Sequence, residues 1–230
     1  MALIMILSKM LNSENREQGF TLVELMITLV IGSFISAGIL MAFSSQNQSY
    51  VAQEQVTQMQ QNLRAGLGML IRELRMAGYD PNGILDPLDS SREPITVTSS
   101  DSITFRMDDP ANPGTIKSFS YALADLDGDG DNDLIRSESG SIASILMENV
   151  DGLEFYYTLA DGTGTLSPTA PQDIRTVEVT VLVRAERPDK NFTNTASYPH
   201  PGGTPWVVSD NYRRRLLSAV IKCRNMGYGN

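Results

Sequence analysis

The sequence predicts an α+β protein. A long N-terminal helix, with a transmembrane half and an amphipathic half, packs on a mostly antiparallel β-sheet domain. Three observations predict this fold. An apolar stretch runs from Phe20 to Phe43 with Glu24 as its only charged residue. Residues 44–78 continue with apolar side chains at helical spacing and no proline. After Pro81 the sequence changes to short alternating runs separated by Gly, Pro, Asn, Asp and Ser, which are typical of strands and turns.

The bulk composition is that of a globular protein and limits the possible functions. Of the 230 residues, 41% are apolar and 20% charged, and the formal net charge is −9. A negative protein lacks the clustered positive charge that nucleic acids require. The single cysteine, Cys223, excludes an internal disulfide and is predicted to be a small buried apolar residue. The single histidine, His200, argues against histidine catalysis or a multi-histidine zinc site, and we predict that the chain is not an enzyme.

The first apolar segment, residues 20–43, is long enough to cross a membrane. As a helix it would measure about 36 Å, against a hydrocarbon core of about 30 Å. A secretory signal peptide would have a shorter apolar core and a small-residue cleavage site. A simple anchor has no use for Glu24, whose charge would cost about 2.5–3.5 kcal/mol at mid-bilayer. A self-assembling helix does have a use, because a neighbouring subunit's N-terminal ammonium could pair with Glu24.

The start of this segment carries a recognisable motif. Gly19-Phe20-Thr21-Leu22-Val23-Glu24-Leu25 resembles the prepilin cleavage and methylation motif of type IV pilins and type II secretion pseudopilins. The resemblance implies that residues 1–19 are a leader peptide, that prepilin peptidase cuts after Gly19, and that it methylates Phe20. It also implies that Glu24 helps subunits dock into a filament. Residues 20–43 would then be the transmembrane and assembly helix.

Residues 44–78 are predicted to be an amphipathic helix that packs on the sheet. The apolar residues that form one helical face are Val56, Met59, Leu63, Leu67, Leu70 and Leu74. Gly66 and Gly68 interrupt the helix, each costing about 1 kcal/mol relative to alanine. We interpret both as locally tolerated in a well-packed helix, rather than as points of close backbone approach. Gly78, with Pro81 shortly after it, predicts the end of the helix.

Residues 79–230 are predicted to form a β-rich head domain. The predicted strands are Ile95–Thr98, Ser102–Met107, Ile116–Leu123, Leu134–Ser137, Ile145–Glu148, Leu153–Leu159, Thr176–Arg184 and Arg215–Cys223. Strict alternation of valines at 177, 179, 181 and 183 predicts one buried face. Residues 189–211 read as a long loop in which His200 has no evident role, and Trp206 could cover the core or lie at an interface. The basic run at residues 213–215 is interpreted as a strand start with solvated or salt-bridged arginines, in preference to a DNA or lipid contact.

Several later segments narrow the resemblance to one branch of the pilins. Residues 70–79, 148–155, 175–179 and 212–217 are similar to PilW-type minor pilins. The resemblance implies a single-pass inner-membrane protein with a periplasmic head that later enters a surface pilus. Its implied partners are other minor and major pilins, prepilin peptidase and the inner-membrane assembly machinery. Two alternatives remain open: a minor pseudopilin of a type II secretion system, and a non-polymerising, membrane-anchored, calcium-dependent adhesin.

An acidic loop in the head predicts a structural Ca²⁺ site. Aspartates fall at every second position, at Asp125, Asp127, Asp129, Asp131 and Asp133. They would repel one another without a cation. Positions 1, 3, 5, 6 and 9 match a calcium loop, whereas Arg136 stands where an EF-hand has its bidentate glutamate. We expect an affinity of about 10⁻⁴ to 10⁻³ M. The alternative is a solvated acidic turn.

Overall fold

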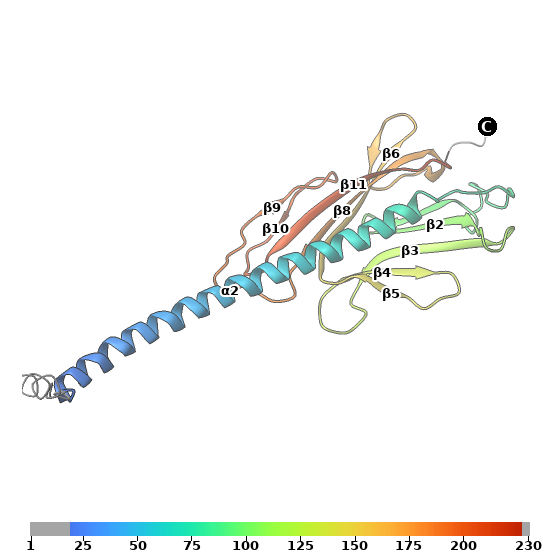
Figure 1. Ribbon diagram of the computed structural model, residues 1–230. Helices are drawn as coiled ribbons and strands as arrows, with labels where there is room; N and C mark the ends of the chain where they lie inside the picture. Colours follow the sequence, from blue (N-terminus) through green and yellow to red (C-terminus); the bar gives the residue numbers. More distant parts are fainter. Residues whose placement is uncertain (1–18, 227–230) are drawn as a thin grey trace, which may run out of the picture. The chain divides into compact units, whose positions relative to one another are not determined.

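The computed structural model describes residues 19–226, so the predicted leader lies outside the described residues except for Gly19. The chain divides into two compact units, residues 1–50 and 51–230. One helix, α2 (Leu22–Leu74), extends over 53 residues and contains most of both predicted helical segments (Figure 1). The predicted helix is therefore confirmed as one continuous element.

The first unit contains the N-terminal part of α2, residues 22–50. Every side chain from Gly19 to Tyr50 is exposed. The helix is long and apolar enough to cross a membrane, with a mean hydropathy of 2.3 over 18 residues. The Thr28 hydroxyl donates to the Glu24 carbonyl at 2.9 Å, and the Ser33 hydroxyl donates to the Val30 carbonyl at 2.7 Å. These hydroxyls satisfy themselves within the helix, as a lipid environment requires.

The second unit begins with the amphipathic part of α2, whose apolar face is buried as predicted. Met59, Leu63, Leu67, Leu70 and Leu74 are each at most 5% exposed. The helix ends at Leu74 and is followed by a turn.

Glycine and a distant side chain complete this turn at the end of α2. Gly78 has a φ of 75°, as a capping glycine would. It does not cap the helix, because α2 ends at Leu74 and the Gly78 backbone N–H donates to the Arg106 carbonyl on β2 at 2.9 Å. The Asn225 side-chain amide donates to the Arg75 carbonyl at 3.3 Å and to the Ala77 carbonyl at 3.5 Å. A residue from the far end of the described chain therefore satisfies carbonyls of the turn that follows the helix.

The predicted antiparallel β-sheet domain is present and consists of two main sheets. The first has the order β1-β2-β3-β4-β5, with β1 (Ile95–Ser99), β2 (Ser102–Asp108), β3 (Ile116–Ala124), β4 (Asp133–Glu138) and β5 (Ser144–Met147). The second has the order β11-β8-β6-β7, with β6 (Val150–Leu159), β7 (Gly164–Thr165), β8 (Ile174–Arg184) and β11 (Arg214–Lys222). A 3₁₀ turn, η1 (Pro171–Asp173), precedes β8. Every predicted strand is present, with ends shifted by at most three residues.

The two sheets separate at the tight connection between β5 and β6. Asn149 occupies this connection with a φ of 58°, the only positive φ of a non-glycine residue among residues 19–226. Strand β5 pairs with β4, whereas β6 pairs with β8. Backbone hydrogen bonds still join the two sheets: the Phe155 amide donates to the Ser100 carbonyl at 2.7 Å, and the Val150 amide donates to the Asn132 carbonyl at 2.7 Å. The α+β fold class is confirmed.

A single hydrophobic core joins α2 to both sheets. Its largest fully buried side chains include Phe105, Tyr121, Phe155 and Tyr157. The Phe105 ring stacks on Phe119 at 5.4 Å and on Tyr121 at 6.1 Å, between ring centroids. Cys223 is 2% exposed, as predicted, and burial raises the pKa of its thiol to about 12. The head is therefore packed around the helix face that the sequence identified.

The structure contradicts the interpretation that Gly66 is only tolerated locally in the helix, because Gly66 lies at a point of close approach. A Cβ atom at this position would lie 2.3 Å from Cγ of Met147 and 3.1 Å from the Leu146 carbonyl oxygen. The helix thus approaches β5 so closely that a methyl group at this position would have to displace the Met147 side chain. At Gly68 an added Cβ would meet nothing within 4 Å, which agrees with the interpretation of local tolerance.

Strand β8 is buried on both faces along its second half. Val177, Val179, Val181 and Val183 face the core, as their alternation predicted. Thr180 and Leu182, on the opposite face, are also at most 1% exposed. The predicted loop 189–211 covers this face of the sheet. His200 and Gly202 contact Glu154, the β6 partner of Thr180, and Trp206 covers Gly152, the β6 partner of Leu182. The loop contains a short hairpin of β9 (Ser197–Tyr198) and β10 (Trp206–Val207), which pair with each other.

Candidate functional site

The predicted processing site lies immediately before the helix. Gly19 and Phe20 adopt no regular structure, and the Phe20 side chain is 85% exposed. An added Cβ at Gly19 would meet nothing within 4 Å. The bond that joins these two residues is therefore in exposed, non-helical backbone. Such backbone can enter a protease site without the unfolding of a helix.

Glu24 has a local role that the sequence analysis missed. The backbone N–H of Thr21 donates to Oε2 of Glu24 at 3.2 Å, and the Thr21 hydroxyl donates to the same oxygen at 3.1 Å. In return the backbone N–H of Glu24 donates to Oγ1 of Thr21 at 3.2 Å. This is a capping box, which fixes the start of the helix at Leu22. The Thr-x-x-Glu spacing was the signal that could have revealed it.

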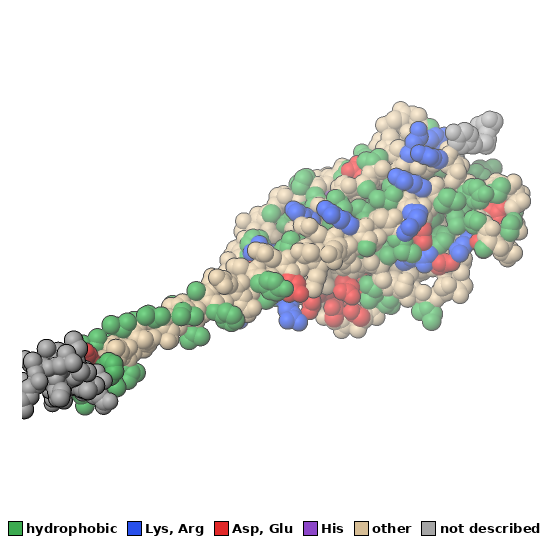
Figure 2. Space-filling view, viewed as in Figure 1, with side chains coloured by type: hydrophobic (Ala, Val, Ile, Leu, Met, Phe, Trp, Pro, Cys, Tyr) green, Lys and Arg blue, Asp and Glu red, His purple; other side chains and the backbone are tan. Residues whose placement is uncertain are grey.

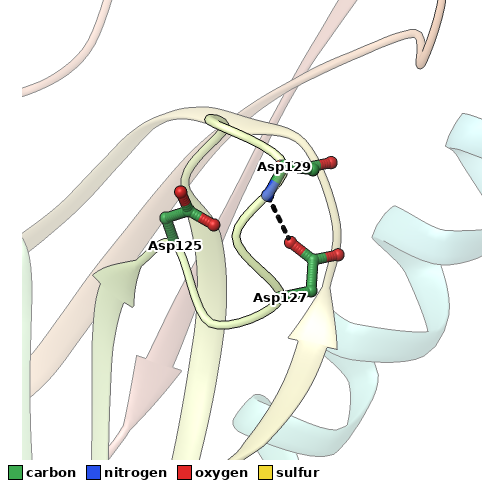
Figure 3. A group of neighbouring side chains, drawn as sticks. All are labelled: Asp125, Asp127 and Asp129. Carbon is green, nitrogen blue, oxygen red and sulfur yellow. Dashed lines mark hydrogen bonds between the residues drawn. The ribbon is translucent and has the colours of Figure 1, made fainter.

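The acidic loop between β3 and β4 brings three of the predicted ligands together. Asp125, Asp127 and Asp129 are exposed, and each offers a carboxylate oxygen within 4.8 Å of the others (Figure 3). The Asp125 carboxylate accepts the backbone N–H of Gly128 at 2.7 Å and of Gly130 at 3.1 Å. Both glycines have a positive φ, 81° and 93°, which lets the loop fold tightly around the carboxylates.

The other two predicted ligands are placed differently. Asp131 forms an ion pair with Arg184, at the end of β8. Asp133, the first residue of β4, is 2% exposed, and its Oδ1 accepts the backbone N–H of Asn149 at 3.1 Å. Its Oδ2 is buried and has no hydrogen-bond partner among residues 19–226. Burial raises the pKa of the Asp133 carboxyl, and the charges of Asp127 and Asp129 raise it further.

This donor set suits a hard cation. Three carboxylates converge, those of Asp125, Asp127 and Asp129. Asp133, at the start of β4, lies outside this group and has a buried oxygen without a hydrogen-bond partner in the described chain. Calcium takes carboxylate, carbonyl and water oxygens in flexible numbers, so an open loop of this kind can bind it. A buried carboxylate oxygen without a partner costs free energy that a bound cation or a water would recover.

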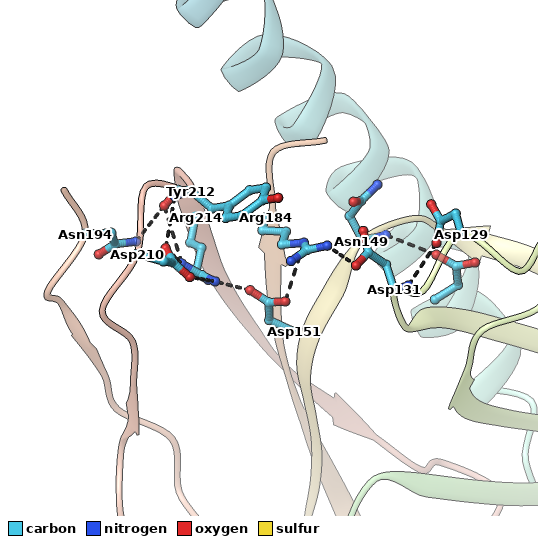
Figure 4. Close-up of polar contacts among 10 residues, drawn as sticks. Asp129, Asp131, Asn149, Asp151, Arg184, Asn194, Asp210, Tyr212 and Arg214 are labelled. Carbon is cyan, nitrogen blue, oxygen red and sulfur yellow. Dashed lines mark hydrogen bonds and ion pairs between the residues drawn. The ribbon is translucent and has the colours of Figure 1, made fainter. Parts of the chain in front are cut away.

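An ion-pair network joins the acidic loop to the second sheet (Figure 4). Arg184 pairs with Asp131, and its Nε lies 3.7 Å from Oδ1 of Asp151. Arg214 pairs with Asp151, and its two terminal nitrogens each donate to an oxygen of Asp210 at 2.6 Å. Both guanidinium groups lie against the ring of Tyr212, at 4.4 and 6.0 Å from its centre. The network links the position of the acidic loop to β6, β8 and β11.

The basic run at residues 213–215 lies at the start of β11, as predicted: Arg213 precedes the strand, and Arg214 and Arg215 are its first two residues. Arg213 pairs with Asp189 at 2.7 Å, and Arg214 is only 4% exposed within the network. Arg215 is exposed. The salt-bridged interpretation therefore applies to Arg213 and Arg214.

His200 and Trp206 hold the hairpin loop on the second sheet. Nδ1 of His200 lies 2.6 Å from Oε2 of Glu154 on β6, and Nε2 lies 2.8 Å from the Thr204 carbonyl oxygen. The His200 ring stacks on Trp206 with centroids 4.3 Å apart, and the indole covers Gly152. Glu154 and His200 are separated by 46 residues, so no local pattern could have revealed the pair.

Comparisons with known proteins find two family profiles that match separate parts of the chain. A family profile described as the prokaryotic N-terminal methylation motif matches residues 15–40. A second profile, described as type IV pilus-assembly protein W, matches residues 131–225. Among solved structures, a type IV-like pilin from Thermus thermophilus matches with 17% identity and a TM-score of 0.47. The match covers 73% of this chain and 97% of that chain. No curated protein sequence matches the chain.

Proposed function

We propose that this chain, a type IV pilin-like protein with the N-terminal methylation motif and a PilW-type domain, is a minor pilin. It enters a pilus initiation or tip complex through its N-terminal helix. The observation that carries this proposal is the first unit: an exposed apolar helix whose first turn holds the carboxylate of Glu24. The match of residues 131–225 to the pilus-assembly family favours a pilus over a type II secretion system.

The mechanism follows from the chemistry of the first helical turn. Cleavage after Gly19 by prepilin peptidase creates a new amine at Phe20, which is then methylated. In the filament, the apolar helix faces pack against other pilins. The charge of Glu24 is neutralised there by the amine of a neighbouring subunit. An unpaired charge in that environment would cost several kcal/mol, so the pair selects correctly docked subunits.

The capping box allows the charge of Glu24 to be tested separately from its cap. In Glu24→Gln the amide still caps the helix, because glutamine serves in a capping box, but the negative charge is lost. We expect normal membrane insertion and cleavage, and incorporation into pili reduced at least about tenfold, since several kcal/mol of ion pairing are removed. Incorporation is measured by immunoblotting of sheared pili against the membrane fraction.

The matched control is Thr21→Val, which removes the cap and keeps the charge. It should lose about 0.5–2 kcal/mol of helix stability and still be incorporated. Mass spectrometry of the mature N-terminus should show N-methyl-phenylalanine at Phe20 in both variants. An unprocessed N-terminus, or equal incorporation of Glu24→Gln and the wild type, would contradict the proposal. Deletion should abolish pilus-dependent motility and spare protein secretion, which excludes the secretion pseudopilin.

We also propose that the acidic loop binds a structural Ca²⁺ through Asp125, Asp127 and Asp129. The converging carboxylate oxygens of these three residues support it. The bound ion would hold the β3–β4 connection in place and, through Asp131 and Arg184, keep it against the second sheet. Its role is structural, because the loop is not part of a catalytic arrangement in the described chain.

Calcium binding should raise the melting temperature of the purified full-length protein in detergent. We expect half-saturation at about 10⁻⁴ to 10⁻³ M Ca²⁺ and little response to equal Mg²⁺. Asp127→Asn should remove the response. Asp161→Asn, in the exposed turn between β6 and β7, is the matched control and should respond like the wild type. Absence of a calcium-dependent heat in calorimetry at millimolar Ca²⁺ would exclude the site.

A further inference from the structure

Strand β11 is a long open edge of the second sheet. It forms one end of the order β11-β8-β6-β7 and is nine residues long. The strands at the other sheet ends, β1, β5 and β7, have five, four and two residues. A long exposed edge presents unpaired backbone groups that another strand can bind. Native proteins usually protect such edges or use them.

The register shows which backbone groups of β11 face outward. Cys223 donates to the Arg175 carbonyl, and Ala185 donates to the Arg213 carbonyl. Along an antiparallel strand, residues whose backbone N–H and carbonyl bond to the partner strand alternate with residues whose backbone N–H and carbonyl point away from it. The outward groups therefore belong to Leu216, Ser218, Val220 and Lys222. Within residues 19–226, no hydrogen bond reaches their backbone N–H or carbonyl groups from outside the β8 pairing.

The exposed side chains along this edge are uncharged in the middle and basic at the ends. Val220 is 64% exposed, and Ser218 is exposed beside it. Arg215, Lys222 and Arg224 are exposed and have no ion-pair partner within the described chain. Figure 2 shows basic side chains gathered near the C-terminal ends of α2 and β11 on this face. The protein as a whole carries a net charge of −9, so the positive charge at this edge is opposite in sign to the net charge of the protein.

The charge argues against pairing with a second copy of the same strand. No aspartate or glutamate occurs from Arg213 to Arg224, so two β11 strands would bring only like charges together. A segment that carries acidic residues would instead meet complementary charge at both ends of the strand. Its backbone would satisfy the outward donors and acceptors, as in other cases of strand addition.

We propose that the β11 edge is a docking site for an extended acidic segment of another protein, which adds to the second sheet as an outer strand. Backbone hydrogen bonds supply the attachment. Arg215, Lys222 and Arg224 select an acidic partner and reject a second copy. The proposal concerns the head alone, so it does not depend on cleavage at Gly19 or on the charge of Glu24.

Site-specific photo-cross-linking of the full-length protein in its own cells tests the proposal. A photoreactive amino acid is placed at Ser218 or at Val220, and at Ile142, 94% exposed between β4 and β5, as the control. The cross-linked peptides are sequenced by mass spectrometry. We expect both β11 positions to capture one acidic segment, at sites about two residues apart, as strand spacing requires. The control position should not capture it.

Proline substitution separates strand addition from ordinary side-chain contact. Val220→Pro removes an outward N–H and leaves the β8 pairing intact, so cross-linking from Ser218 should fall at least about tenfold. Val220→Thr keeps the donor and should cross-link like the wild type. Lys222→Glu should also reduce the yield. Membrane level and N-terminal processing of each variant show that the protein is made and folded.

Three results would overturn the inference. These are capture of a second copy of this chain, capture of a basic or helical segment, and no capture from β11 in protein that is correctly processed. Equal cross-linking by Val220→Pro and Val220→Thr would likewise exclude strand addition. If Glu24→Gln behaves like the wild type while β11 captures an acidic strand, the pilin mechanism fails and this inference stands.

Discussion

Replacement of Arg136 by alanine is expected to destabilise the head by about 3–5 kcal/mol. Arg136 on β4 holds the helix to the first sheet: its Nε donates to Glu73 at 3.0 Å and its Nη2 at 2.8 Å. Nη2 also donates to Glu138 at 2.7 Å, and the guanidinium lies 4.9 Å from the centre of the Phe119 ring. The side chains of Arg136 and Glu73 are 14% and 16% exposed. Without the cation, Glu73 stays largely buried with only the Tyr121 hydroxyl as a donor.

The measurement is chemical unfolding of the full-length protein in detergent, as a double-mutant cycle with Glu73→Ala. Each single mutant leaves one charge buried without its counterion, whereas the double mutant leaves neither. The double mutant should therefore lose much less stability than the two single losses added together. Arg187→Ala is the control. Its pair with Glu186 is 75% and 67% exposed, so we expect a change below about 0.5 kcal/mol. Equal effects of Arg136→Ala and Arg187→Ala on the free energy of unfolding would show that the Arg136–Glu73 pair does not hold α2 on the first sheet.

Alanine at Gly66 and alanine at Gly68 should have opposite effects on stability, although the two positions are two residues apart on one helix. Gly66→Ala drives a methyl group into Met147 and towards the Leu146 carbonyl, and we expect a loss of about 1–3 kcal/mol. Gly68→Ala meets open space and should gain about 1 kcal/mol from helix propensity. Because each variant adds the same methyl group, each is the control for the other.

Both variants are measured by thermal and chemical unfolding under identical conditions. Combining Gly66→Ala with Met147→Ala should recover part of the loss, since the smaller side chain makes room for the methyl group. The carbonyl of Leu146 remains, so recovery should be incomplete. A stabilising Gly66→Ala would mean that the helix does not approach β5 as closely as the structure shows.

Much of the fold could be predicted because its signals are local. The apolar stretch after Phe20, the helical spacing up to Leu74 and the glycine at Gly78 each specify an element within a few turns of chain. Strand positions followed from short alternating runs, since period-two alternation reflects a single buried face. The valines of β8 show the limit: they indicated one buried face, and the hairpin loop covered the other.

The candidate site was predictable in part for the same reason. The spacing of aspartates grouped Asp125, Asp127 and Asp129, because residues in one tight turn must lie close together. It could not show that Asp131 pairs with Arg184, since that partner lies on another sheet. The cap between Thr21 and Glu24 is local and was overlooked, whereas the pair of His200 and Glu154 has no local signal.

The sequence by itself determined the processing motif, the apolar helix, the amphipathic face and the order of the strands, because each depends on neighbours along the chain. Only the tertiary structure decided how the head divides into two sheets at Asn149. It also decided which glycine allows close approach, which aspartates remain together, and which strand edge stays open. These depend on contacts between residues far apart in sequence, and such contacts are set by packing and charge in three dimensions.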